Sequence, residues 1–368
     1  MIKDNDIISP YQITAITIMT LIGVGIFSLP RELAEAAGTN SVIMVLIGGI
    51  LSLFVMGILV TLNCRFPGKA LPAYSGEIIG KVPAKVLTFI YIIYFTAFIG
   101  YEARVMGEAV KLFLLSNTPP EVIILSIILA CTYAVRGGVE CIGRAMEVFF
   151  PFLFIPMILI MLPGITDADF SNLLPVFYGL PSKFFKALPV MALSFSGYGL
   201  LLFYVGFMKK PKKAYIYASV GIAIVTVFYM LIVVLCLSMF GVKVVEGMIW
   251  PLLSYVRSVN LPGLFIERLD GVMLGIWVFA VYTTMISFYF ALTYSLSCLL
   301  GTKEQKQFAL IMVPFIYLAS VLPQNFAQVD KVPVYLIQYF GSVLIFIVPL
   351  LLLIIAWIRK KGGSKNEG

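Results

Sequence analysis

The 368-residue sequence contains no histidine, and charged residues make up only 12% of it. Without histidine, the chain has no His-based acid–base catalysis, no histidine metal ligand and no Ser-His nucleophile pair. Its five cysteines are scattered without a CxxC pair, so neither a zinc site nor a disulfide framework is indicated. A phosphate-binding P-loop is also missing from the sequence. We therefore expect a protein that is not an enzyme and has no cofactor, no metal site and no ATP drive of its own.

Apolar residues make up 61% of the sequence, which is more than a packed soluble core needs. A helical membrane span takes about 20 apolar residues, and uncharged apolar runs recur along the whole chain. They predict spans at about 11–30, 41–63, 86–110, 122–135, 147–164, 187–207, 214–240, 271–299, 308–323 and 335–358. The expected fold class is an all-α polytopic membrane protein with about ten transmembrane helices. It forms a single domain over 1–368, and the lipid bilayer surrounds it.

The positive charges predict the orientation of these spans. Of the Lys and Arg residues, 17 fall in the termini and loops on one side and 8 in the loops on the other. Cytoplasmic loops carry the excess of Lys and Arg, so both termini, including a tail over 359–368, are expected in the cytoplasm. This bias also explains the net charge of +8, and no nucleic acid partner is expected.

Two connections on the outer side are long enough to carry structure of their own. They cover about 164–186 and 241–270, and both mix apolar with polar residues. The second predicts either an amphipathic helix on the outer face or an ordinary interfacial linker. In the helical alternative, Trp250 and Tyr255 would lie at the depth of the membrane interface.

Two glycine- and serine-rich segments interrupt the first and the sixth span. Gly23, Val24, Gly25 and Ile26 precede Pro30, and Ser194, Phe195, Ser196 and Gly197 follow Pro189. The interruptions are five spans apart, an odd number, so the two halves have opposite orientations. This pattern predicts a five-plus-five inverted repeat, with repeat one at about 11–164 and repeat two at about 187–358. Glycine that simply permits close helix packing is the alternative.

Broken helices expose main-chain groups that can bind a ligand at the membrane midplane. A half-helix N-terminus after Gly25 presents free N–H groups suited to a carboxylate. Carbonyl groups freed at Ser194–Gly197 suit an ammonium group. Together the two breaks predict a site for a zwitterionic amino acid.

The segment Gly23-Val-Gly-Ile-Phe-Ser-Leu-Pro30 resembles the first-helix signature of the amino acid–polyamine–organocation superfamily. More specifically, residues 7–358 resemble the permease-like B subunits of spore germinant receptors. The motifs that carry this likeness are Asn117-Thr-Pro119, Asn172-Leu-Leu-Pro175 with Gly179, and Trp250-Pro with Arg257 and Phe265-Ile-Glu-Arg-Leu-Asp270. One departure is Val24, where the superfamily signature often has Ser or Thr.

The resemblance implies a LeuT-like fold that senses a small nutrient, often an amino acid, in the spore inner membrane. It also implies germinant receptor A and C subunits as partners, and it does not imply net transport. In this fold the third helix faces the ligand, so Tyr94, Phe98 and Tyr101 are candidate pocket walls. Aromatic core packing is the alternative for each of them.

Hydroxyl groups in span 8 are further candidates for ligand binding, namely Thr283, Thr284 and Ser287. Such hydroxyls often bond the carbonyl of their own preceding turn instead. Near the end of span 3 lie Glu102, Arg104, Glu108 and Lys111, and the last three share a charged stripe at i,i+4 and i,i+3 spacing. These charges predict either an outer gate of Glu102, Arg104 and Glu108 or a solvated helix end with modest ion pairing.

These features favour a nutrient-sensing subunit over a transporter. Residues 148–163 of span 5 contain no Lys, Asp or Glu, which removes the obvious intramembrane proton relay. An amino-acid permease that carries out transport stays the second hypothesis. A structural or channel-like component that binds nothing is the third.

Overall fold

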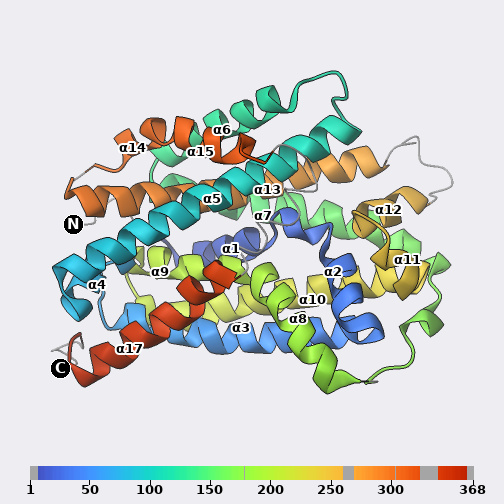
Figure 1. The fold of residues 1–368 in the computed structure, drawn as a ribbon, viewed down its shortest axis with the longest axis horizontal. Helices are drawn as coiled ribbons and strands as arrows, with labels where there is room; N and C mark the ends of the chain where they lie inside the picture. Colours follow the sequence, from blue (N-terminus) through green and yellow to red (C-terminus); the bar gives the residue numbers. More distant parts are fainter. Residues whose placement is uncertain (1–6, 178, 260–268, 303, 324–338, 363–368) are drawn as a thin grey trace.

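The computed structural model describes residues 7–177, 179–259, 269–302, 304–323 and 339–362. Over these residues the chain is a bundle of helices, and its only β pairing is an isolated bridge between Ile8 and Met208. Most of the long helices lie roughly along one direction (Figure 1). The predicted all-α membrane architecture is confirmed.

The observed helices fall at the predicted spans. Five described helical segments are long and apolar enough to cross a membrane, and one bent pair adds a sixth. Two shorter apolar segments, Lys306–Val321 and Val343–Ile358, lie at the expected ninth and tenth spans. The helices at the ten predicted positions are α1 (Pro10–Leu21) with α2 (Leu29–Ala37), α3 (Ser41–Cys64), α5 (Lys81–Phe113), α6 (Pro120–Arg136), α7 (Val139–Met161), α8 (Leu180–Ser194) with α9 (Leu201–Tyr204), α10 (Ala214–Phe240), α13 (Leu269–Leu300), α14 (Lys306–Ile311) with α15 (Val313–Val321), and α17 (Val348–Ile358).

Several helix starts differ from the sequence expectation, and α5 and α8 begin at Lys81 and Leu180 rather than at 86 and 187. Helix α7 begins at Val139 rather than at 147, because Glu140 and Arg144 pair one turn apart on its surface and so extend the helix beyond the apolar run. The predicted start of the tenth span, 335–338, lies outside the described residues. The division into repeats at 11–164 and 187–358 stays a prediction.

Helix α1 lies in the centre of the bundle. It packs against α10, α7 and α13, while α13 packs along α5 and α10 packs along α3 (Figure 1). Ser9 caps the start of α1, in a reciprocal capping box with Gln12. The α1 residues Thr14, Thr17 and Thr20 are all buried, so a polar face runs through the core. This face leads directly to the point where the helix breaks.

The outward faces of several helices are apolar. Phe54 of α3 and Ile216 of α10 are each 68% exposed, and Tyr133 of α6 is 85% exposed. Exposed side chains of this kind are costly in water and favourable against lipid tails. Together with the long apolar helices, they fit an integral membrane protein.

The two described chain ends lie on the same side of the bundle. The Ile8 N–H donates to the Phe207 carbonyl at 3.0 Å, and Gly206 lies against the main chain of Lys69. Near the end of α3, the Arg65 side chain donates to the Lys361 carbonyl at 3.1 Å. Two chain ends on the same side of the bundle are consistent with a chain that crosses the membrane an even number of times. A cytoplasmic location for that side stays a prediction.

The opposite side carries short helices over the bundle. The outer connections contain 3-10 turns at Leu162–Asp167 and Phe170–Leu173, followed along the chain by α11 (Val242–Glu246) and α12 (Pro251–Ser258). The helical alternative for the second connection is therefore correct in part. Trp250 and Tyr255 are only 8% and 0% exposed, so both pack into the protein, and their depth in the membrane stays a prediction. The Tyr255 hydroxyl donates to the Met161 carbonyl at 2.8 Å, and this hydrogen bond joins α12 to the end of α7.

Candidate ligand-binding site at the two helix breaks

The first break lies between α1 and α2. Helix α1 ends at Leu21, Gly23 is extended with φ −101° and ψ −152°, and a single 3-10 turn over Val24–Ile26 follows. Helix α2 then begins at Leu29 with Pro30 in its first turn, a position that tolerates proline. The predicted interruption is confirmed. It leaves main-chain groups of Leu21, Gly23 and Val24 outside regular helical pairing.

The second break lies at the end of α8. Helix α8 ends at Ser194, a 3-10 turn covers Ser196–Leu200, and the axis bends by 49°. A Cβ atom on Gly197 would overlap the carbonyl of Thr20 in α1. The two breaks therefore touch, and glycine at 197 is what permits this approach.

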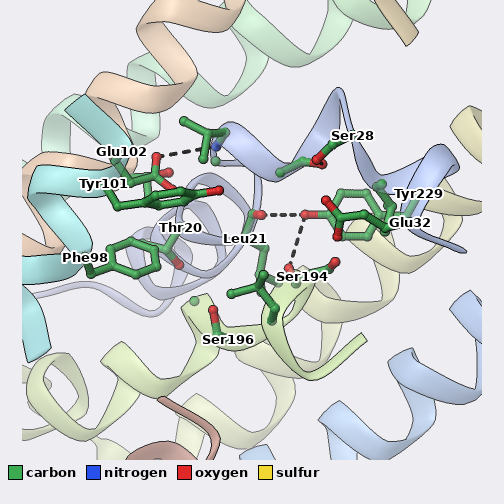
Figure 2. Close-up of a pocket in the computed structure, with 17 residues that line it drawn as sticks. Thr20, Leu21, Ser28, Glu32, Phe98, Tyr101, Glu102, Ser194, Ser196 and Tyr229 are labelled. Carbon is green, nitrogen blue, oxygen red and sulfur yellow. Dashed lines mark hydrogen bonds between the residues drawn. The ribbon is translucent and has the colours of Figure 1, made fainter. Parts of the chain in front are cut away.

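Side chains from α10 and α13 hold the carbonyl groups of the two breaks. The Tyr229 hydroxyl donates to the Leu21 carbonyl at 2.5 Å and lies 3.4 Å from the Ser194 carbonyl (Figure 2). From α13, Thr284 donates to the Met19 carbonyl at 2.9 Å, and the Trp277 indole N–H donates to the Gly23 carbonyl at 3.4 Å. The break in α1 is thus satisfied by polar side chains from neighbouring helices, as membrane-depth backbone requires.

A cavity of about 50 Å³ lies between the breaks. One water molecule needs roughly 10–15 Å³ of such space, so the cavity admits a few waters or the head group of a small ligand. Among the predicted site residues, those that line it are Gly23, Val24, Gly25, Phe98, Tyr101, Ser194, Ser196, Gly197 and Thr284. The predicted residues that meet at the cavity thus come from four spans, two of which contain the breaks.

The remaining predicted ligand residues do not line this cavity. Ile26 is 1% exposed and belongs to the apolar core, and Phe195 packs edge-on against Tyr229. Tyr94 is buried among Phe95 and Phe98, as the core-packing alternative expected. These three residues therefore lie outside the cavity lining, and a ligand contact for them stays a prediction.

Of the three predicted hydroxyl groups in span 8, one lines the cavity and two do not. Thr283 donates to the Ala280 carbonyl at 2.7 Å, and Ser287 donates to the Thr283 carbonyl at 3.0 Å. Both bond their own helix, which is the alternative stated above. Thr284 alone of the three reaches the break and the cavity.

Glu102 occupies a different place from the one predicted. Its side chain is not at the outer boundary but lines the cavity, 3% exposed. Its carboxylate accepts a hydrogen bond from the Val24 N–H at 3.4 Å (Figure 2). The main-chain donor expected to bind a ligand carboxylate therefore binds a carboxylate of the protein.

Arg104 and Glu108 form an ion pair of their own. Their side chains meet at 2.8 Å and are 8% and 23% exposed, and neither lines the central cavity. The pair is more buried than a solvated helix end would be. A gating role for these two residues stays a prediction.

Several cavity residues were missed by the sequence reasoning. They are Thr20, Leu21, Ser28, Leu29, Glu32, Leu193 and Tyr229. Thr20, Ser28 and Glu32 are polar residues near the first break, and that position was an available signal. Tyr229 lies inside an uncharged apolar span, where nothing in the pattern separates it from core aromatics.

A bundle of membrane helices with two broken helices meeting at a central cavity defines the LeuT-like class of transporter folds. Solved structures of that class confirm this. "Structure of Mhp1, a nucleobase-cation-symport-1 family transporter" matches 96% of this chain and 79% of that one, with a TM-score of 0.71 and 12% identity. A Na⁺-coupled sialic acid symporter covers 93% of this chain and 78% of that one, at a TM-score of 0.68 and 12% identity. The structure of MhsT in complex with L-phenylalanine matches 95% of this chain and 98% of that one, with a TM-score of 0.63 and 13% identity.

The family model "Spore germination protein" matches residues 7–329, and the chain belongs to this family. "Spore germination protein YndE" of Bacillus subtilis (strain 168) is 31% identical over 361 residues, covering 96% of this chain and 98% of that one. "Spore germination protein B2" of the same organism is 28% identical, covering 94% of each. The resemblance seen in the sequence is thereby confirmed. The chain is a germinant receptor or permease-like membrane subunit.

Proposed function

We propose that this chain is the nutrient-binding subunit of a spore germinant receptor. A small nutrient, with an amino acid as the first candidate, enters from outside and binds in the cavity between the two helix breaks. Binding shifts the population between two arrangements of the bundle. Germinant receptor A and C subunits sense that shift in the spore inner membrane, with both termini of this chain in the cytoplasm.

The observation that carries this proposal is the meeting of both breaks at one cavity. Irregular backbone at membrane depth is tolerated where it lines a cavity or is buried in protein, and paired broken helices mark the binding site in folds of this kind. The cavity is lined by Gly25 and Ser196, one from each break. With a volume of about 50 Å³, it must widen to admit a whole amino acid. This links binding to a change of conformation.

Substitution of Gly25 tests the proposal. A Cβ atom on Gly25 meets nothing within 4 Å, so Gly25→Leu fits the fold and places its side chain at the cavity. Spores that carry this variant should lose their nutrient response while the protein stays in the membrane. Gly57→Leu is the matched control, because Gly57 of α3 also has open space around a new Cβ atom and does not line the cavity. An undiminished response in Gly25→Leu spores would contradict the proposal.

Transport by a permease is the second candidate function. The observation that favours it is the fold shared with symporters. Uptake of labelled nutrient by proteoliposomes that contain the full chain separates the two. Uptake above that of empty liposomes would support transport, and binding without uptake would support sensing.

A further inference from the structure

We propose that the site recognises its ligand through a primary ammonium group, and that the Glu102 carboxylate is the group that binds it. This inference rests on the proposed function and deepens it, since it names the chemical class of the nutrient. It also reverses the polarity expected for the first break, where a ligand carboxylate was predicted.

The first support is the incomplete coordination of Glu102. The side chain is 3% exposed, and within the described part of the chain its single hydrogen bond is the one from Val24, at 3.4 Å. An ionised carboxylate has about four lone-pair sites to fill. To stay ionised, a buried carboxylate at membrane depth needs a paired charge or several strong donors. One long hydrogen bond leaves that need unmet, and the open side of the carboxylate is the cavity.

The second support is the direction of the hydroxyl groups around the cavity. Thr20 donates to the Ile16 carbonyl at 2.7 Å, Ser194 to the Val190 carbonyl at 2.9 Å, and Ser28 to the Gly25 carbonyl at 3.3 Å. Each hydroxyl has one proton, so these groups can offer only their oxygen lone pairs to a ligand. Tyr229 and Thr284 also donate to main-chain carbonyls. Five of the seven hydroxyl groups that line the cavity therefore donate to carbonyl groups of the protein, and these five offer a ligand only acceptor lone pairs.

The third support is the balance of charge. Glu32 lines the same cavity as Glu102, and no Lys or Arg is among the described lining residues. The nearby Arg104 pairs with Glu108 instead. A ligand carboxylate placed at Val24 would meet the Glu102 carboxylate, and like charges at such range repel each other. An ammonium group there has three donors for the acceptors that surround it.

These three observations predict an order of affinity. An amine that lacks a carboxylate binds at least as well as the amino acid with the same side chain. The hydroxy acid, which keeps the carboxylate and lacks the ammonium group, does not bind. The small cavity restricts the part that enters to a compact primary ammonium head group.

Matched probes test this order on the full chain in lipid nanodiscs. Three series are measured by thermal shift: glycine, methylamine and glycolate; L-alanine, ethylamine and L-lactate; L-valine, isobutylamine and L-2-hydroxyisovalerate. In at least one series, the amine and the amino acid should stabilise the protein, and the hydroxy acid should not. Glu102→Gln keeps the shape of the side chain and an acceptor for Val24, and it should weaken binding by about tenfold or more.

Glu35→Gln is the matched control, because Glu35 is an exposed partner of Arg31 on α2, and it should leave binding unchanged. Stabilisation by a hydroxy acid, or unchanged amine affinity in Glu102→Gln, would overturn the inference. Stabilisation by Na⁺ that depends on Glu102, without any effect of amines, would overturn it as well. If a hydroxy acid binds and Gly25→Leu abolishes that binding, the proposed function stands without this inference. If no probe binds, both are contradicted.

Discussion

Gly197 and Thr20 bring the two broken helices into direct contact. The main-chain carbonyl of Thr20 lies where a Cβ atom of residue 197 would be. No side chain at this position is compatible with the observed approach, because the obstacle is backbone rather than a flexible side-chain end. The contact fixes the distance between the breaks and so determines the size of the cavity between them.

Gly197→Ala should therefore destabilise the protein. The new methyl group forces α1 and the α8 break apart, and overpacking of this kind costs about 1–3 kcal/mol. Thermal unfolding of the detergent-purified chain measures the effect. Gly275→Ala on α13 is the control, since a Cβ atom there meets nothing within 4 Å. Equal stability of the two variants would show that the breaks do not touch.

Tyr229→Phe should also destabilise the protein, by about 0.5–1.5 kcal/mol, because it removes the hydroxyl donor of the buried Leu21 carbonyl, which then accepts only from the Gly23 N–H at 3.1 Å. The same change loosens the first break and should weaken ligand binding. Thermal unfolding and ligand titration measure the two effects separately. Tyr133→Phe, at a position 85% exposed, should change neither. A Tyr229→Phe variant with unaltered stability and affinity would contradict the role assigned to this hydroxyl group.

Gly23→Ala tests whether the position of the Glu102 carboxylate affects ligand binding in a protein that still folds. A Cβ atom on Gly23 would lie 3.0 Å from one Glu102 carboxylate oxygen and 3.3 Å from the other. The side-chain end can move by a few tenths of an ångström, so the protein should fold with a displaced carboxylate. Affinity for an amine ligand should fall, whereas Gly25→Ala, with open space around it, should affect it less. Equal affinities in the two variants would show that the position of Glu102 is unimportant.

Arg104 and Glu108 provide a test of the predicted gate. Glu108→Gln removes the partner of a guanidinium whose side chain is 8% exposed, and unpairing a buried charge costs up to about 3–5 kcal/mol. If the pair controls ligand entry, Glu108→Gln should change the association rate constant of the ligand. The equilibrium dissociation constant of the folded variant should stay the same. Stopped-flow binding measures that rate. An unchanged rate would assign the pair to stability alone.

The spans and both breaks could be predicted from the sequence because their signals are local. Apolar runs give the helices, and Gly23, Gly25 and Gly197 mark where the helices end. The partners of the breaks could not be predicted in this way. Glu102 looks like a helix-end charge in sequence, and its place at Val24 depends on the packing of α5 against the first break.

The division of the hydroxyl groups has a similar cause. Thr283 and Thr284 are adjacent and chemically identical, yet α13 turns only Thr284 toward the carbonyl groups of α1. The rotation of a uniformly apolar helix is set by its neighbours and leaves no periodic signal in the sequence. Tyr229 was missed for the same reason.

Nutrient binding by the purified full chain tests the central claim most directly. Titration of the wild type, Gly25→Leu and Gly57→Leu with small amines and amino acids compares the cavity with a matched position outside it. Saturable binding in the wild type and Gly57→Leu, lost in Gly25→Leu, is the predicted result. Equal binding in all three proteins would show that the ligand does not occupy the cavity between the breaks.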